Sequence, residues 1–299
     1  MTRLTEAAYA KVNLCLFLGG TRSDGRHELV TLFESVGLQD ELVITPAPGG
    51  ADVVLCPGVE SPNLVEAALA GLRAAGWSAP PVRVRISKRI PVAAGLGGGS
   101  ADAAALLRCA PRLGTVVPER VQALAASLGA DVPSQVLPGP AIGTGAGEVL
   151  QPVGELAPHA LLLLPQAVAL LTPDVYAEAD RLGLARAPAE LAALRSELVA
   201  SLSRGSLDRM PPGQLVLNDL QPAALSLCPR IEPALAAALE SGADQAIVCG
   251  SGPTVIGIYR GDQTIERARA SAQEMRRQFP KAAAVLPTSF PSGTIHRLP

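Results

Sequence analysis

The sequence predicts an α+β protein of two domains, from its length, its mixture of strand and helix patterns, and a change of texture near its middle. A chain of 299 residues is long enough for about two domains. Hydrophobic residues make up 48% and charged residues 17%, a globular composition with ample material for a core. Around residues 140–165 a Gly/Pro-rich stretch gives way to a buried-looking strand. We therefore place the boundary near residue 150, between domains 1–150 and 151–299.

The first domain is predicted to mix strands with helices. Alternation of apolar and polar residues indicates strands, and apolar residues three or four apart indicate helices. The predicted strands are 4–18, 29–37, 41–45, 52–55 and 82–88, and the predicted helices are 63–75, 101–110 and 118–128. Ser61 and Pro62 are typical of a helix start. Turn-rich segments follow residue 20 and residue 128.

The second domain is predicted to hold helices first and a strand-rich part after them. The predicted elements are strand 160–164, helices 173–182, 189–203 and 230–241, strands 245–249 and 255–260, helix 263–279 and strand 282–286. The closing order of strand, loop, strand, helix and strand is typical of an α+β sandwich. We expect the last dozen residues to be loosely packed.

Composition and charge exclude several classes of function. The formal net charge is -2 and no run of Lys or Arg occurs, so we expect no nucleic-acid partner. No apolar run approaches the roughly 20 residues of a membrane span, and the N-terminus lacks a signal-peptide pattern. The five cysteines include no C-x-x-C pair, which favours buried free thiols over metal ligands. We therefore expect a cytoplasmic protein without a dedicated metal site.

Two polar residues stand out in the first predicted strand. Lys11 and Asn13 alternate with apolar neighbours, so both side chains lie on one face of the strand. Buried polar groups are costly unless they are paired, so both need partners. A lysine at a strand edge usually reaches solvent, and Asn13 on the same face weakens that interpretation of Lys11.

A glycine-rich loop between a strand and a helix is the strongest local signal. Residues Gly95 to Ser100 include four glycines, whose backbone N–H groups can wrap phosphate oxygens without interference from a Cβ atom. The N-terminus of the following helix adds a partial positive charge. A tight turn against a packed helix is the alternative, but a turn needs fewer glycines. A Walker A loop is disfavoured because Ser100 is followed by Ala101, and the position far from the chain start disfavours a dinucleotide fold.

Three motifs in order resemble those of the GHMP kinase family. Residues 91–100 resemble its phosphate loop, P-x-x-x-G-L-G-S/G-S/G-S. Residues 10–14 (A-K-V-N-L) resemble its N-terminal motif, and residues 250–254 (G-S-G-P-T) resemble its third, glycine-rich motif. Together these motifs span most of the chain. The resemblance implies the two-domain α+β GHMP kinase fold, with the active site in the cleft between the domains and ATP as phosphoryl donor.

Further segments resemble one branch of that family. They are D-G-R-H-E-L at 24–29, L-G-A-D-V-P at 128–133, T-P-D-V-Y at 172–176 and N-D-L-Q-P at 218–222. By this resemblance the substrate is 4-diphosphocytidyl-2-C-methyl-D-erythritol, and ATP phosphorylates its 2-hydroxyl in the non-mevalonate isoprenoid pathway. Mg²⁺ is expected with ATP, and Ser100 is the only ligand suggested for it. The alternatives are another GHMP kinase, acting on homoserine, a sugar or a mevalonate derivative, and a binding module of the same fold without activity.

The resemblance assigns two catalytic residues. Asp131 is the expected base, because a carboxylate in reach of a hydroxyl can accept its proton. From its position two residues before Pro133, a helix-capping role is equally open. The charge of Lys11 would keep Asp131 ionised and stabilise phosphoryl charge.

The resemblance also assigns the binding residues. The nucleotide-binding residues are Asn63, Lys88, Pro91, Gly95, Leu96, Gly97, Gly98, Gly99, Ser100 and Ala101, and the substrate-binding residues are Asn13, Arg26, His27, Thr172 and Tyr176. Each isolated side chain has a plainer interpretation. Asn63 could be an ordinary residue at a helix start, Lys88 a solvated lysine, His27 a surface histidine and Tyr176 a core residue.

Arg26 departs from the family pattern, which has Tyr at this position. That Tyr is the expected second wall of a stack on cytosine, opposite Tyr176. Arg can stack through its planar guanidinium or bind the diphosphate. The partners expected are the small-molecule substrate and ATP, with the chain acting as a monomer or a homodimer.

Overall fold

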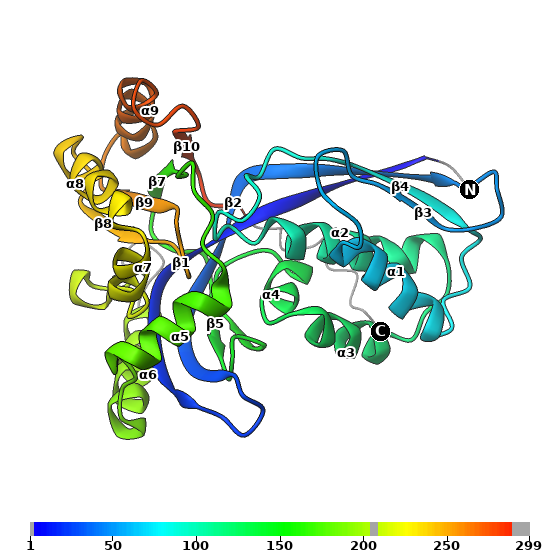
Figure 1. Cartoon of the computed structure of the whole chain (residues 1–299), viewed down its shortest axis with the longest axis horizontal. Coiled ribbons are helices and arrows are strands. Elements are labelled where there is room, and N and C mark those ends of the chain that lie inside the picture. Colours follow the sequence, from blue (N-terminus) through cyan, green and yellow to red (C-terminus); the bar gives the residue numbers. More distant parts are fainter. Residues whose placement is uncertain (1–2, 204–208, 289–299) are drawn as a thin grey trace.

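The chain folds into two sheets, each covered by helices (Figure 1). The computed structural model describes residues 3–203 and 209–288. The predicted loose packing of the last dozen residues concerns residues 289–299 almost entirely, which lie outside this description. The α+β class and the two-domain architecture predicted from the sequence are confirmed.

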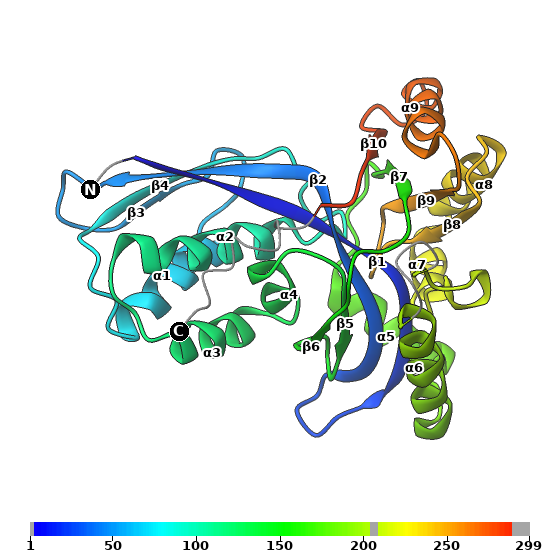
Figure 2. The same ribbon diagram turned by 180° about the vertical axis from the view of Figure 1, so that it is seen from behind.

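A six-stranded sheet forms the first half of the molecule. Its strands are β1 (Leu4–Thr21), β2 (His27–Pro46), β3 (Val53–Leu55), β4 (Val82–Ser87), β5 (Ala141–Thr144) and β6 (Val149–Pro152). They follow the order β3-β4-β2-β5-β6, with β1 antiparallel to β2. The helices of this half are α1 (Leu64–Ala74), α2 (Gly98–Leu113), α3 (Pro118–Leu128) and α4 (Val132–Val136). They lie together on one side of the long strands (Figure 2).

A four-stranded antiparallel sheet forms the second half. It comprises β7 (His159–Leu164), β8 (Gln245–Val248), β9 (Val255–Arg260) and β10 (Ala283–Val285), in the order β10-β7-β9-β8. The helices are α5 (Thr172–Leu182), α6 (Pro188–Leu202), α7 (Gln221–Leu227), α8 (Glu232–Glu240) and α9 (Thr264–Met275), with short 3-10 turns at Gly213–Leu215 and Pro229–Ile231. No helix in the described ranges is long and apolar enough to cross a membrane.

The paired strands β1 and β2 connect the two halves (Figures 1 and 2). β1 is buried on both faces from Ala10 to Gly19, so its polar members are enclosed as well. Leu14 and Phe17 of β1 pack in one hydrophobic cluster, which includes residues of both halves, whereas Leu16 and Leu18 pack in a second cluster with residues of the second half. β1 therefore carries its polar residues into the region where the halves meet.

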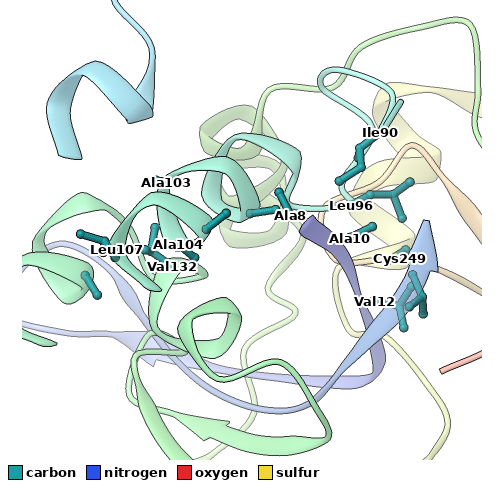
Figure 3. Close-up of a cluster of buried hydrophobic side chains, with 14 of the residues drawn as sticks. Ala8, Ala10, Val12, Ile90, Leu96, Ala103, Ala104, Leu107, Val132 and Cys249 are labelled. Carbon is teal, nitrogen blue, oxygen red and sulfur yellow. The ribbon is translucent and has the colours of Figure 1, made fainter. Parts of the chain in front are cut away.

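Small side chains bring α2 close to β1. Ala8, Ala10 and Val12 of β1 belong to one apolar cluster with the buried alanines of α2 (Figure 3). Leu96, from the loop before α2, and Cys249, from the loop after β8, join the same cluster (Figure 3). This packing fixes the glycine loop and the N-terminus of α2 against the strand that carries Lys11.

The strands predicted at 29–37 and 41–45 are one strand in the structure, β2. Its pairing with β1 skips Gly37 and Leu38, because Ala10 pairs with Val36 and Tyr9 pairs with Gln39. The N–H of Gly37 donates instead to Leu286 O at 2.9 Å. The bulge interrupts the alternation of apolar residues without ending the strand.

Four short elements were not predicted: α4, β5, β6 and α7. The helices α4 and α7 have five and seven residues, too few for a helical period to be visible in the sequence. β5 contains Gly143, where a Cβ atom would lie 2.5 Å from the Phe33 ring. The glycine that suggests a loop is therefore required for close packing inside the sheet.

Candidate active site

A cavity of about 810 Å³ opens between the two halves of the molecule. The first half contributes Lys11, the glycine loop and Asp131, and the second contributes segment 172–180 together with Gly250 and Ser251. Residues predicted as catalytic, nucleotide-binding and substrate-binding therefore line one cavity. Of the seventeen described residues with an expected role, all line it except Ala101, which is buried in the first turn of α2.

The glycine loop is held by contacts that only glycine allows. Gly95 has φ +77, and a Cβ atom on it would lie 2.6 Å from Gly252 O. Gly97 has φ +68, and its Cβ atom would lie 2.5 Å from the Gln135 amide nitrogen. Both positions lie in the left-handed region, where side chains are strained. The loop is also attached to β1, because Lys11 N–H donates to Leu96 O at 3.0 Å.

The N-terminus of α2 faces the cavity without a side-chain cap. Gly97 occupies the capping position, and the first helical hydrogen bond runs from Ala101 N–H to Gly97 O at 2.8 Å. The N–H groups of the first turn, which has no acidic residue, have no partner within the helix. Gly98, Gly99 and Ser100 line the cavity at this point. These donors and the helix dipole suit an anion.

Lys11 is the centre of a buried polar chain. Its Nζ atom donates to Asn13 Oδ1 at 2.8 Å, Asn13 Nδ2 donates to Thr31 Oγ1 at 2.7 Å, and Thr31 Oγ1 donates to Cys15 O at 2.6 Å. The partners expected for Lys11 and Asn13 are therefore present. The alternative interpretation, a lysine that reaches solvent from a strand edge, is wrong for Lys11, because its side chain is only 7% exposed.

Asp131 pairs with Lys11 at the cavity wall. The distance from Lys11 Nζ to Asp131 Oδ2 is 3.2 Å, and the Asp131 side chain is 34% exposed. Asp131 occupies the position before α4, but its side chain makes no capping hydrogen bond. The sequence left two roles open for Asp131, a catalytic base and a helix cap. The side chain does not cap α4, and its carboxylate instead contacts Lys11 at the cavity wall.

The third glycine-rich segment packs against this pair. A Cβ atom on Gly250 would lie 3.1 Å from Asn13 Oδ1 and 3.5 Å from Lys11 Nζ. Asn218 is buried and holds the segment, since its Nδ2 atom donates to Val248 O and Gly250 O, both at 2.7 Å. Ser251 Oγ lies 3.0 Å from Thr172 Oγ1. All three motifs of the family resemblance thus meet at Lys11.

Lys88 lies between two buried carboxylates. Its Nζ atom donates to Asp102 Oδ2 at 2.7 Å and also to Asp40 Oδ2. Burial raises the pKa of Asp102 to about 7, with Lys88 opposing the rise and Asp40 adding to it. Burial also disfavours the charge of Lys88, but the two carboxylates outweigh it and raise the Lys88 pKa. Lys88 is therefore not a solvated lysine.

Asn63 caps α1 while it lines the cavity. Its Oδ1 atom accepts from Val65 N–H at 3.0 Å and from Glu66 N–H at 3.2 Å. The Glu66 side chain accepts from Asn63 N–H at 2.8 Å, which completes a capping box. The helix predicted at 63–75 therefore begins one residue later, at Leu64, and Asn63 rather than Ser61 is its capping residue. The amide nitrogen of Asn63 is left for another partner.

His27 and Tyr176 lie together at the other end of the cavity. Their ring centroids are 5.1 Å apart, and His27 is buried, so it is not a surface histidine. His27 Nε2 lies 2.7 Å from Asp180 Oδ1. Arg26 is exposed, and its Nε and Nη2 atoms donate to Asp24 Oδ2 at 3.1 and 3.0 Å.

Several residues at the site were not predicted. Five of them contact predicted site residues directly: Asp180, Asp40, Asp102, Thr31 and Ser251. A sixth, Asn218, holds the third glycine-rich segment in place. A signal existed for Asp180, which lies four residues after Tyr176 and so on the same helix face. No local sequence pattern pointed to Asp40, because its contact with Lys88 joins segments 48 residues apart.

No group of three or more His, Cys, Asp or Glu side chains in the described residues could hold a metal ion. The hydroxyl of Ser100 and the carboxylate of Asp131 line the cavity beside the open helix N-terminus. Oxygen atoms of this kind fit Mg²⁺ when phosphate oxygens supply most of its ligands.

Comparison with known proteins gives one consistent result. Residues 63–139 match the model of the GHMP kinases N terminal domain, and residues 191–278 match that of the GHMP kinases C terminal domain. The 4-diphosphocytidyl-2-C-methyl-D-erythritol kinase of Streptomyces avermitilis is 39% identical over 307 residues, covering 98% of this chain and 99% of the relative. That of Streptomyces coelicolor is 42% identical over 260 residues, covering 84% and 86%.

Solved structures agree with the sequence comparison. A crystal structure of 4-(cytidine 5'-diphospho)-2C-methyl-D-erythritol kinase superposes with a TM-score of 0.75 at 33% identity. The match covers 96% of this chain and 100% of that chain. A homoserine kinase from Cytophaga hutchinsonii superposes with a TM-score of 0.71 at 18% identity, covering 97% and 95%. At that identity the second likeness concerns the fold alone.

Proposed function

The chain belongs to the GHMP kinase family, among the 4-diphosphocytidyl-2-C-methyl-D-erythritol kinases, and from this membership we propose how its cavity performs the reaction. The reaction transfers the γ-phosphoryl group of ATP to the 2-hydroxyl of the methylerythritol moiety, a step of the non-mevalonate isoprenoid pathway. ATP is the co-substrate of this family of kinases.

Asp131 is the proposed base, and the observation that carries this role is its ion pair with Lys11 at the cavity wall. The 2-hydroxyl oxygen attacks the γ-phosphorus, and its proton passes to Asp131. The bond from the γ-phosphorus to the bridging oxygen breaks, and ADP leaves with that oxygen. Lys11 pairs with the carboxylate and faces the charge that develops on the phosphoryl oxygens.

The open N-terminus of α2 is the proposed phosphate site. The N–H groups of Gly98, Gly99 and Ser100 supply donors, and the short contacts of Gly95 and Gly97 hold the loop in place before ATP arrives. Pro91 and Leu96 contribute to the same wall, and Ala101 contributes the first helical hydrogen bond. We propose Ser100 as the protein ligand of Mg²⁺. Bound Mg²⁺ would neutralise charge on the phosphates.

Asn63 and Lys88 are proposed to contact the adenosine part of ATP. The Oδ1 atom of Asn63 is committed to the helix cap, so the Nδ2 donor is the group offered to the base. Lys88 carries three donors, and Asp40 and Asp102 engage two of them. The third is available to ATP.

The other end of the cavity is proposed to bind the cytidine diphosphate moiety. His27 and Tyr176 would contact cytosine, and Thr172 with Asn13 would lie along the path to the reacting hydroxyl. Arg26 replaces a Tyr found in the family, and its guanidinium is held by Asp24 beside the cavity. We propose that it serves as the second wall of the stack or as a diphosphate contact.

We propose that the chain acts as a monomer or a homodimer. We also propose that the boundary between the two domains lies near residue 150.

All five cysteines are free thiols, which fits the reducing cytoplasm as the proposed location.

The function is tested by ADP release from Mg-ATP with four acceptors: 4-diphosphocytidyl-2-C-methyl-D-erythritol, homoserine, galactose and mevalonate. Release that depends on the cytidyl substrate, and is largely lost in Asp131→Asn, is the expected result. Release with another acceptor alone would contradict the substrate. No release with any of the four would favour a binding module.

A further inference from the structure

His27 and Asp180 form a hydrogen-bonded pair beside the cavity. Asp180 Oδ1 lies 2.7 Å from His27 Nε2, and the next nearest partner, Thr21 Oγ1, lies at 3.4 Å. An ionised carboxylate can only accept a hydrogen bond, so Nε2 carries the hydrogen. We propose that Asp180 is a positioning residue that holds His27 in its Nε2–H tautomer and thereby makes the site select cytosine over uracil.

The pair is held by the fold on both sides. His27 is the first residue of β2 and pairs with Thr21 of β1 across the hairpin. Asp180 and Tyr176 lie one turn apart on α5, so the carboxylate and the phenol ring approach the imidazole from the same helix face. The His27 side chain is 7% exposed, whereas that of Asp180 is 52% exposed. The imidazole therefore has little freedom, and the carboxylate fixes which nitrogen carries hydrogen.

The other ring nitrogen is left for a ligand. No group in residues 3–203 or 209–288 hydrogen-bonds to His27 Nδ1 in the structure. In the Nε2–H tautomer, Nδ1 is an acceptor. Cytosine presents an exocyclic amino donor at the position where uracil presents a carbonyl acceptor. A lone pair on Nδ1 attracts the amino group of cytosine and repels the carbonyl oxygen of uracil. This step rests on the proposed contact between His27 and the base.

Asp180→Asn separates this role from a purely structural one. The amide has the same shape, but it can donate to Nε2 as well as accept from it, so it no longer specifies the tautomer. The Nδ1–H tautomer then becomes accessible, and it can donate to the carbonyl of uracil. The ratio of kcat/KM for the cytidyl substrate to that for its uridyl analogue is expected to fall about tenfold, the effect of one neutral hydrogen bond. The change should lie in KM, because Asp180 does not touch Lys11 or Asp131.

Asp174→Asn is the matched control, an identical substitution on the same helix at an exposed position that does not line the cavity. It should leave the ratio unchanged.

The tautomer can be observed without turnover. The chain has three histidines, so nitrogen-15 spectra of the labelled protein can be assigned with one His27→Gln variant. In the wild type, His27 is expected to show a protonated Nε2 and an unprotonated Nδ1, and Asp180→Asn is expected to shift this pattern. A wild-type His27 protonated at Nδ1 would overturn the proposal, even if the variant fails to fold. An unchanged cytidyl-to-uridyl ratio in a folded Asp180→Asn would overturn it too. Failure of the proposed function is distinguishable, since the wild type would then turn over neither substrate.

Discussion

At the scale of single residues, the balance of charge around Lys88 has a measurable consequence. Asp40 is fully buried, and its Oδ1 atom accepts Ile90 N–H at 2.8 Å. Asp102 is nearly as buried, but its Oδ1 atom has no partner in the structure. Asp40 is thus the better hydrogen-bonded of the two carboxyl groups, and Asp102 is the one that holds a proton near neutral pH, consistent with its pKa of about 7.

Asp102→Asn is expected to change how stability depends on pH. The pKa of Asp102 is raised to about 7 in the folded state, from about 3.9 in an unfolded chain. The folded state therefore binds the proton more tightly, and stability falls as pH rises from about 4 to about 7. Asn cannot titrate, so the variant should gain stability relative to the wild type across that range. Urea unfolding at several pH values measures this difference, and a constant difference would contradict the assignment.

The sequence was informative about residues whose environment is local. Alternation along one strand places Lys11 and Asn13 on the same face, and both have the polar partners that this placement requires. The pairing of His27 with Asp180 joins residues 153 positions apart. Such a contact depends on how the hairpin meets α5, and no local pattern encodes it. The roles assigned to the individual site residues remain predictions.

At the scale of elements, the glycine loop depends on its contact with the loop after β8. Gly95 approaches both Gly252 O and Cys249 O, and both would lie within 2.8 Å of an added Cβ atom. Because these atoms are backbone, they cannot rotate away as a side chain can. The geometry of the phosphate site is therefore coupled to the third glycine-rich segment.

Gly95→Ala is expected to destabilise the protein by about 2 kcal/mol or more, from the left-handed backbone and the clash. Activity should fall with it, since the loop must move relative to Lys11. Gly49→Ala is the control, because nothing lies within 4 Å of its Cβ position and its φ is not in the left-handed region. Thermal unfolding of both variants checks the effect, and equal stabilities would contradict the packing described here.

Element prediction succeeded where an element is long and periodic. The helix predicted at 118–128 matches α3, Pro118–Leu128. It failed where packing overrides the local pattern, as at Gly143, whose place in a strand is set by the Phe33 ring. Similarly, α2 begins at Gly98, three residues before its predicted start. Glycines there signal a loop, but the helix extends into them.

At the scale of the whole molecule, a buried ion pair joins the two sheets. His159 of β7 contacts Glu34 of β2 at 2.8 Å, and both side chains are 2% exposed. His159 Nδ1 also donates to Ala157 O at 2.8 Å. Burial disfavours the charged imidazole, but Glu34 outweighs this and raises the pKa of His159 above its ordinary 6.5. The pair therefore links the halves in a pH-dependent way.

His159→Gln should remove that dependence. A His pKa raised by folding stabilises the protein fully below about pH 6.5, and this contribution is lost as pH rises through the folded value. The wild type is therefore expected to lose unfolding free energy above about pH 6.5 more steeply than the variant. Glu34→Gln should flatten the profile in the same way. Parallel profiles for all three proteins would show that the pair does not titrate in this range.

The arrangement of the two halves around one cavity was predicted from the order of three motifs, and the family relationship agrees with it. Within the cavity, the central claim is that Asp131, paired with Lys11, accepts the proton of the 2-hydroxyl.

Single-turnover phosphoryl transfer by Asp131→Asn, with ATP and 4-diphosphocytidyl-2-C-methyl-D-erythritol affinities measured by calorimetry on the same protein, tests this claim most directly. Loss of a positioned base predicts a transfer rate about 10²–10⁴-fold lower, with both affinities near those of the wild type. A transfer rate close to that of the wild type, with both substrates bound, would contradict the role of Asp131.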